Sequence, residues 1–153
     1  MDVHGSLCRV HSTGVLLRGE PGAGKSWQCL HLLERGHGLV ADDCVILSSQ
    51  HQALQGQSPS AHKPQLALRG VGIVDVQQAF GPKAWTAQAQ TIGWLVELQH
   101  SPPQCTIPEL RFTEVLGHAI PTLHLPTGAN HSAVIELCCR LGPERLQAWK
   151  RTP

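Results

Sequence analysis

Three absences narrow the classes of protein that this sequence of 153 residues can encode. No apolar run approaches the roughly 18–20 residues of a membrane-spanning helix, and the first ten residues, MDVHGSLCRV, have no signal-peptide pattern. No excess of charge of one sign is present either. The formal net charge of +1 provides no electrostatic basis for nucleic acid or an anionic membrane as a partner. We therefore expect a cytoplasmic protein.

Metal-binding and disulfide patterns are also missing. The six cysteines form no C-x-x-C pair and lie mostly among apolar neighbours, which predicts reduced, buried thiols. The ten histidines are scattered, and none is paired with another at i, i+4 or with a cysteine at ligand spacing. We interpret most of them as ordinary core or surface histidines.

The composition that remains is that of a globular α/β domain. Apolar residues make up 41% of the chain and charged residues 15%, and no internal repeat is visible. We expect a single domain over residues 1–153. Two polar segments, 48–65 and 99–109, are predicted to be loops, the first of them flexible, because they are rich in Gln, Ser and Pro.

The ordered segments alternate between strand and helix patterns. A helix is expected from Lys25 to the terminating Gly36, another from Asn130 or Ser132 to Gly142, and a short third one from Pro143 to about Trp149. Short apolar runs predict strands at 15–18, 38–41, 44–48, 91–99 and 120–126, and residues 65–76 read as strand, glycine turn and strand. This order indicates a mixed sheet flanked by helices.

A glycine-rich turn carries the clearest chemistry. The stretch GEPGAGKS follows an apolar run, opens into a helix and fits the pattern G-x-x-x-x-G-K-[ST] without a mismatch. Glycines permit close approach of the backbone, and the loop N–H groups with the helix N-terminus then attract phosphate oxygens. Lys25 is expected to reach the β- and γ-phosphates and Ser26 to bind Mg²⁺. The residues predicted to contact ATP are Gly19, Glu20, Pro21, Gly22, Ala23, Gly24, Lys25 and Ser26.

Two adjacent carboxylates follow the predicted strand at 38–41. At the end of a strand, soon after a phosphate-binding helix, Asp42 and Asp43 are typical of a metal-binding acid beside a catalytic carboxylate. An acidic turn between two strands is the alternative, because Asp favours turns. The glycine loop nearby favours the functional interpretation, with Asp42 and Ser26 as the predicted metal ligands.

Three blocks of the chain resemble the HPr kinase/phosphorylase family. They are VHGSLCRVHSTGVLLRGEPGAGKS with its His-Gly pair, LERGHGLVADD, and LALRGVGIVDV with its Arg-Gly-x-Gly element. A weaker likeness lies in LPTGANHSAVIEL. The resemblance implies a P-loop fold similar to phosphoenolpyruvate carboxykinase. The short form of the family without a separate N-terminal domain, found in proteobacteria, is expected.

The activity that the resemblance implies is ATP-dependent phosphorylation of a serine of the carrier HPr, and phosphorolysis of phospho-HPr at the same site. It implies Asp43, with Asp42 beside it, as general base, Lys25 on the transferring phosphate, His4 near that phosphate, and Arg69 in the signature segment. It also implies ATP and Mg²⁺ as cofactors and a hexamer as the assembly. A serine hydroxyl needs such a base because it is a weak acid.

The chain departs from the family at two positions of its motifs. Ala67 stands where the family has a metal-binding glutamate, and Ala129 replaces an arginine associated with dephosphorylation. A further catalytic arginine has no assigned counterpart, with Arg111 as one candidate. Two other hypotheses therefore stay open: a P-loop phosphotransferase or ATPase with another substrate, and a non-catalytic nucleotide-binding regulator.

Overall fold

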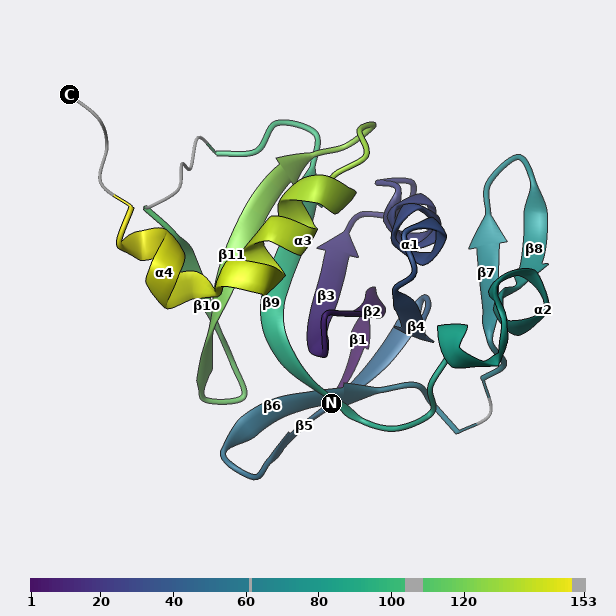
Figure 1. Cartoon of the computed structure of the whole chain (residues 1–153), viewed down its shortest axis with the longest axis horizontal. Coiled ribbons are helices and arrows are strands. Elements are labelled where there is room, and N and C mark those ends of the chain that lie inside the picture. The colour runs from purple at the N-terminus through teal and green to yellow at the C-terminus, as the bar shows by residue number, and fades with distance from the viewer. Residues whose placement is uncertain (61, 104–108, 150–153) are drawn as a thin grey trace.

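A curled mixed β-sheet with helices on one face forms the body of the protein (Figure 1). The computed structural model describes residues 1–60, 62–103 and 109–149. Its nine-stranded sheet has the order β1-β5-β6-β9-β3-β2-β4, with β11 pairing with β9 and β10 with β11. The strands of this sheet are β1 (Asp2–His4), β2 (Ser6–Val10), β3 (Thr13–Gly19), β4 (Gly38–Ala41), β5 (Cys44–Gln50), β6 (Ala53–Gln57), β9 (Gln90–Gln99), β10 (Arg111–Val115) and β11 (His118–Pro126).

A separate two-stranded hairpin, β7 (Gln65–Leu68) and β8 (Gly72–Asp75), lies at one end of the molecule beside the helix α2 (Val76–Phe80) (Figure 1). A 3₁₀ turn, η1 (Pro82–Ala84), leads from α2 toward β9. The larger helices are α1 (Lys25–Glu34) and α3 (Ser132–Leu141), and the short α4 (Pro143–Gln147) follows α3. In the described residues no helix is both long and apolar enough to cross a membrane.

The middle of strand β3, from Val15 to Leu17, is apolar without interruption because both of its faces are buried there. Val15 and Leu17 belong to the core cluster beneath α1 and α3, whereas Leu16 belongs to the cluster on the opposite face. All three side chains are at most 1% exposed. Parallel pairing with β9 then fixes the direction of β3, so that its carboxyl end reaches the glycine-rich turn.

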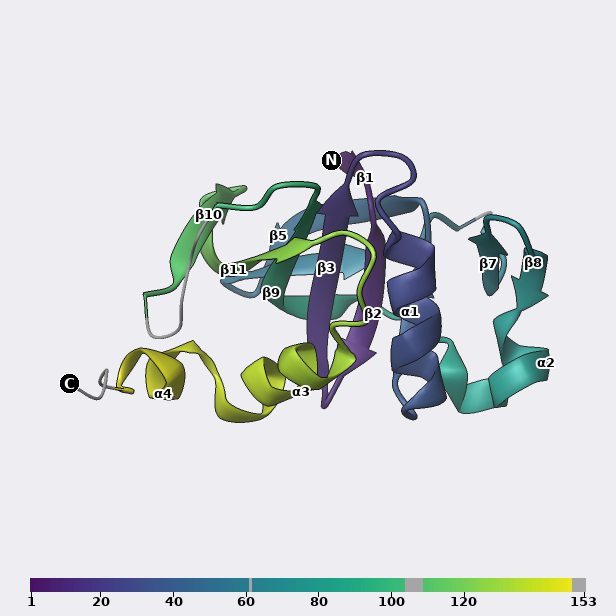
Figure 2. The same ribbon diagram turned by 90° about the horizontal axis from the view of Figure 1, so that it is seen from above.

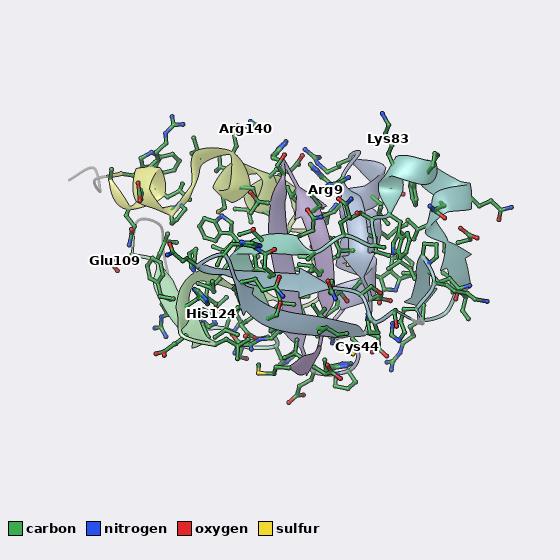
Figure 3. The ribbon with its side chains drawn as sticks, turned by 90° about the horizontal axis from the view of Figure 1, so that it is seen from below. Arg9, Cys44, Lys83, Glu109, His124 and Arg140 are labelled. Carbon is green, nitrogen blue, oxygen red and sulfur yellow. The ribbon has the colours of Figure 1, made fainter. Side chains whose placement is uncertain are left out.

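Helix α1 begins at this turn and runs back beside the sheet, in the direction opposite to β3 (Figure 2). Gly24 precedes its first residue with a φ of 99°, a left-handed conformation that glycine adopts without steric cost. In the view from below, Arg9 and Lys83 lie on one side of the molecule and Cys44 lies on the other (Figure 3). Cys44 directly follows Asp43 in the sequence. Arg9 Nη2 donates a hydrogen bond to the Lys83 carbonyl at 3.4 Å.

Helix α3 is held against the end of α1 by a charged contact. Glu136 on α3 accepts hydrogen bonds from Arg35 Nε, just after α1, and from His37 Nε2 at 2.9 Å. Burial alone would raise the pKa of the Glu136 carboxyl, but these two donors outweigh burial and lower it. A second link lies at the other end of α3, where the buried Gln28 side chain donates to the Ser132 hydroxyl at 2.9 Å.

The predicted helices and strands are confirmed with small shifts in their ends, including the strand at 38–41 and the strand-turn-strand at 65–76. The prediction of a loop over 48–65 is wrong in part, because β5 extends to Gln50 and β6 lies within this segment. β6 contributes one large apolar side chain, Leu54, to the core, so its sequence shows little periodicity. Its pairing with β5 and β9 makes it a strand. Part of the second predicted loop, residues 104–108, lies outside the described residues.

The five described cysteines are free thiols, in agreement with the predicted reduced state. The prediction of burial is confirmed for Cys8, Cys29 and Cys138, whereas Cys44 and Cys139 are only half-buried. Cys8 and Cys29 are fully buried, and the Cys8 thiol donates to Cys29 Sγ at 3.3 Å between β2 and α1. Cys105 lies outside the described residues. Strands β1, β2 and β10 and helix α2 were not predicted.

Candidate functional site

A cleft of about 440 Å³ lies between the glycine-rich turn, the end of β4 and the β7–β8 hairpin. The five residues predicted to be catalytic all line it: His4, Lys25, Asp42, Asp43 and Arg69. They come from four segments far apart in the sequence. The tertiary structure therefore brings together side chains that the sequence analysis had connected only through separate motifs.

The glycine-rich turn connects β3 to α1 and forms one wall of the cleft. Gly22 has a φ of 87°, and a Cβ at this position would lie 3.4 Å from Arg69 Nη1. The turn thus needs glycine here for its backbone conformation, and its surface lies close to the Arg69 guanidinium. Of the other residues predicted to bind ATP, Gly19, Glu20 and Ala23 line a neighbouring cleft of about 840 Å³ on the other side of the turn.

The Lys25 side chain folds back over the turn. Its ammonium group donates to the Gly19 carbonyl at 2.7 Å and to the Glu20 carbonyl at 3.2 Å. Burial lowers the pKa of Lys25, and the nearby Asp43 and Asp42 carboxylates partly oppose this shift. Two backbone carbonyls of the turn therefore hold the Lys25 ammonium group in place.

Ser26 and Asp42 form a compact group of oxygen atoms. The Ser26 hydroxyl lies 3.0 Å from Asp42 Oδ1 and 3.1 Å from Oδ2. The Ser6 hydroxyl donates to Asp42 Oδ1 at 2.7 Å. Hard oxygen donors at this spacing suit Mg²⁺, which binds few protein ligands and retains several waters. The residues present therefore fit a Mg²⁺ ion between Ser26 and Asp42.

Asp43 is more exposed than Asp42 and lies at the mouth of the cleft. Its side chain is 80% exposed and its Oδ1 lies 3.3 Å from His4 Nδ1. The backbone of Asp43 has a φ of 72°, which is uncommon for a residue with a side chain. Such strain occurs often at functional sites. The carboxylate is thus turned to where an incoming substrate could meet it.

Sequence reasoning missed two residues of the cleft, Ser6 and Trp27. The available signal for Ser6 was its hydroxyl directly after the His4-Gly5 pair. The available signal for Trp27 was its position directly after Lys25-Ser26, which places it in the first turn of the helix beside the loop. The residue is 38% exposed. Ala67, where the resemblance implies a glutamate, also lines the cleft.

The segment around Ala129 lies near the first turn of α1. Ala129 lines a small cavity together with Trp27 and Gln28. Gln28 Oε1 accepts a hydrogen bond from the backbone of His131 at 2.8 Å, which fixes this segment to α1. Arg111 lies on the edge strand β10 and is not among the residues that line the 440 Å³ cleft.

The fold and the cleft define a mixed α/β domain whose curled sheet directs a glycine-rich turn at two acidic residues. A family model described as HPr Serine kinase C-terminal domain matches residues 1–148, and the chain belongs to this family. The solved structure titled HPr(Ser) kinase/phosphatase from Coxiella burnetii is 30% identical, with a TM-score of 0.81, over 92% of this chain and 88% of that one.

Curated relatives agree with this assignment. An HPr kinase/phosphorylase from Streptococcus pneumoniae is 39% identical over 141 residues, covering 88% of this chain and 45% of the relative. One from Caldicellulosiruptor bescii is 35% identical over 141 residues, with the same coverage of 88% and 45%. The chain thus spans a little under half the length of these curated relatives.

Proposed function

We propose that this protein transfers the γ-phosphate of ATP to a serine of an HPr-type phosphocarrier protein, with Mg²⁺ as its metal. One observation carries the proposal: Lys25, Asp42, Asp43, His4 and Arg69 line a single cleft beside the glycine-rich turn. The resemblance and the relatives' names suggest which acceptor the cleft would serve. We also propose that the same cleft removes the phosphate by phosphorolysis.

In the forward reaction Asp43 accepts the proton of the attacking serine hydroxyl. The serine oxygen forms a bond to the γ-phosphorus while the bond from this phosphorus to the bridging oxygen of ADP breaks. Asp43 suits this role because its carboxylate lies at the mouth of the cleft, where a protein side chain has access. His4, 3.3 Å from the same carboxylate, orients it.

Charge neutralisation supplies the rest of the catalysis. Lys25 would exchange its contacts with the Gly19 and Glu20 carbonyls for contacts with the transferring phosphate. Arg69 would contact the same phosphate from the β7–β8 hairpin, since it lies beside Gly22. When bound by Ser26 and Asp42, Mg²⁺ would supply further positive charge at the phosphate oxygens. In the reverse reaction an oxygen of inorganic phosphate forms a bond to the phosphoserine phosphorus while the bond from this phosphorus to the serine oxygen breaks. Asp43 takes the proton of the attacking hydrogen phosphate and gives it to the serine oxygen, and pyrophosphate is released.

Four further properties belong to the proposal. They are a single domain over residues 1–153, a P-loop fold related to phosphoenolpyruvate carboxykinase, hexameric assembly and a cytoplasmic location, all of which agree with the family resemblance. Light scattering of the purified chain tests the assembly, because a hexamer would have six times the mass of 16.6 kDa.

A second candidate function is nucleotide binding without transfer. Its support is Ala67, which lines the cleft without a carboxylate, so that the metal has one ligand fewer than in the family pattern. A regulator of this kind would bind ATP and change conformation or partner without phosphorylating a carrier. Transfer to an acceptor other than HPr is the remaining alternative.

One assay separates these possibilities. The protein is incubated with labelled ATP, Mg²⁺ and the HPr-type carrier of its own host, and phosphoserine is measured. Transfer that disappears in Asp43→Asn and Lys25→Ala but persists in Glu114→Gln supports the kinase. Glu114 is a matched control because it is an exposed acid on β10 outside the cleft. ATP binding without transfer to the carrier would refute it.

A further inference from the structure

Three side chains of types that can bind metal ions lie close together at the end of the molecule opposite the cleft. His11 lies in the turn between β2 and β3, His37 lies between α1 and β4, and Glu136 lies on α3. The ligating atoms of these side chains all lie within 4.8 Å of one another. Residues 26 and 99 positions apart are brought together here, which is why no histidine spacing in the sequence indicated a site.

Two of the three side chains are already ordered by burial and hydrogen bonding. The side chains of His37 and Glu136 are 8% and 11% exposed, and His37 Nε2 lies 2.9 Å from Glu136 Oε2. Arg35 Nε donates to the other carboxylate oxygen, Oε1. Oε2 is therefore the oxygen that faces the imidazoles, whereas Arg35 fixes the orientation of the carboxylate as outer-shell partners of metal ligands do.

His11 completes the cluster from the solvent side. Its ring stands edge-on to the His37 ring, with 5.1 Å between the ring centroids. Among the described residues, the His11 ring nitrogens have no hydrogen-bond partner. His11 also adopts a φ of 48°, a left-handed conformation in which asparagine or glycine is more common in hairpin turns. The conformation of this turn therefore does not explain why residue 11 is a histidine.

We propose that His11, His37 and Glu136 bind a divalent transition-metal ion, with Zn²⁺ as the best match. Two imidazoles and one carboxylate form a known zinc ligand set that leaves a fourth position for water. With metal–ligand distances of about 2.0–2.2 Å, neighbouring ligand atoms in a tetrahedral site lie roughly 3.3 Å apart. Because the ligating atoms lie within 4.8 Å of one another, the exposed turn that carries His11 has to move by at most about 1.5 Å to reach this spacing. Imidazole nitrogens also select zinc over Mg²⁺, which prefers oxygen.

The site is distinct from the predicted Mg²⁺ site. Helix α1 rises about 1.5 Å per residue and ends at Glu34, so its last residue lies roughly 12 Å along the helix axis from Ser26, and His37 follows this end of the helix. A metal here would not contact the transferring phosphate. It would link the β2–β3 turn, the segment after α1 and the helix α3, and so stabilise the folded chain against unfolding.

The test uses the full chain without a histidine tag, from which bound metal has been removed with a chelator. This protein is titrated with Zn²⁺ as the only transition metal, in a buffer that contains excess Mg²⁺. Calorimetry is expected to give one zinc per chain. Replacement by Co²⁺ is expected to give the visible absorption bands of a tetrahedral ion. His11→Asn should weaken zinc binding by about tenfold or more, because it removes one ligand. Zinc should also raise the Tm of the unmodified protein but not that of His11→Asn.

His51→Asn is the matched control. His51 lies at the same place of another hairpin turn, between β5 and β6, with a φ of 53°. Asparagine suits a left-handed φ, so both variants should fold. Zinc affinity unchanged in His51→Asn but reduced in His11→Asn supports the proposal. It is overturned by the absence of stoichiometric binding, by equal affinity in His11→Asn and the unmodified chain, or by binding that Asp42→Asn removes instead.

Discussion

The Ser26 hydroxyl lies 3.0 and 3.1 Å from the two carboxylate oxygens of Asp42. This contact joins the first turn of α1 to the end of β4. A third group, the Ser6 hydroxyl, holds Asp42 Oδ1 at 2.7 Å from the side of β2. A metal ion between Ser26 and Asp42 would thus have a carboxylate whose orientation is set by a residue that does not itself bind the metal.

Ser6→Ala is therefore expected to raise the Mg²⁺ concentration required for half-maximal phosphorylation by about tenfold, as loss of an outer-shell partner does. At saturating Mg²⁺ the KM for ATP should stay near that of the unmodified protein. Ser49→Ala, an exposed serine outside the cleft, is the control and should leave the requirement unchanged. An unchanged Mg²⁺ requirement in Ser6→Ala would show that Ser6 has no positioning role.

Ala67→Glu should lower the Mg²⁺ requirement. Ala67 is exposed and lines the cleft, so a glutamate there has space and adds a hard oxygen ligand near Asp42. The matched control is Ala67→Gln, which has the same size without the charge. The measurement is phosphorylation rate against Mg²⁺ concentration, and equal curves for the two variants would contradict this prediction.

Gly5→Ala should destabilise the fold and disturb His4. A Cβ on Gly5 would lie 2.7 Å from the backbone carbonyl oxygen of Leu17, which cannot move without shifting β3. We expect a loss of about 1–3 kcal/mol in the free energy of unfolding, measured with urea. Gly38→Ala is the control, because its closest atom at 3.2 Å is the flexible end of Arg9, and its effect should stay below about 1 kcal/mol. Similar losses in both variants would argue against the backbone clash.

Cys138 should resist alkylation in the folded protein. Burial raises the pKa of its thiol to about 11, so at pH 8 only about one molecule in a thousand carries the reactive thiolate. Labelling by iodoacetamide, followed by mass spectrometry, should be about a hundredfold slower than in urea-unfolded protein. The rate should rise about tenfold per pH unit up to the pKa. Rapid labelling at pH 7 in the native state would contradict the burial of this thiol.

Much of the secondary structure follows from local sequence patterns. The strand at 38–41, the helix beginning at Lys25 and the strand-turn-strand at 65–76 are each specified by neighbouring residues. β6 was missed because a strand with one large buried side chain depends on its neighbours for its conformation. β6 also pairs with β9, more than thirty residues further along the chain, and no short window of the sequence contains both of these strands.

The chemical groups of the candidate site can be identified from local motifs: the glycine-rich turn, the Asp42-Asp43 pair and the segment containing Arg69. Their positions relative to one another depend on the folded chain, because the β7–β8 hairpin has to fold against the turn before Arg69 lies beside Gly22. The same holds for His11, His37 and Glu136. The residue types are given by the sequence, but the distances between remote segments are set when the strands pair and the helices pack against the sheet.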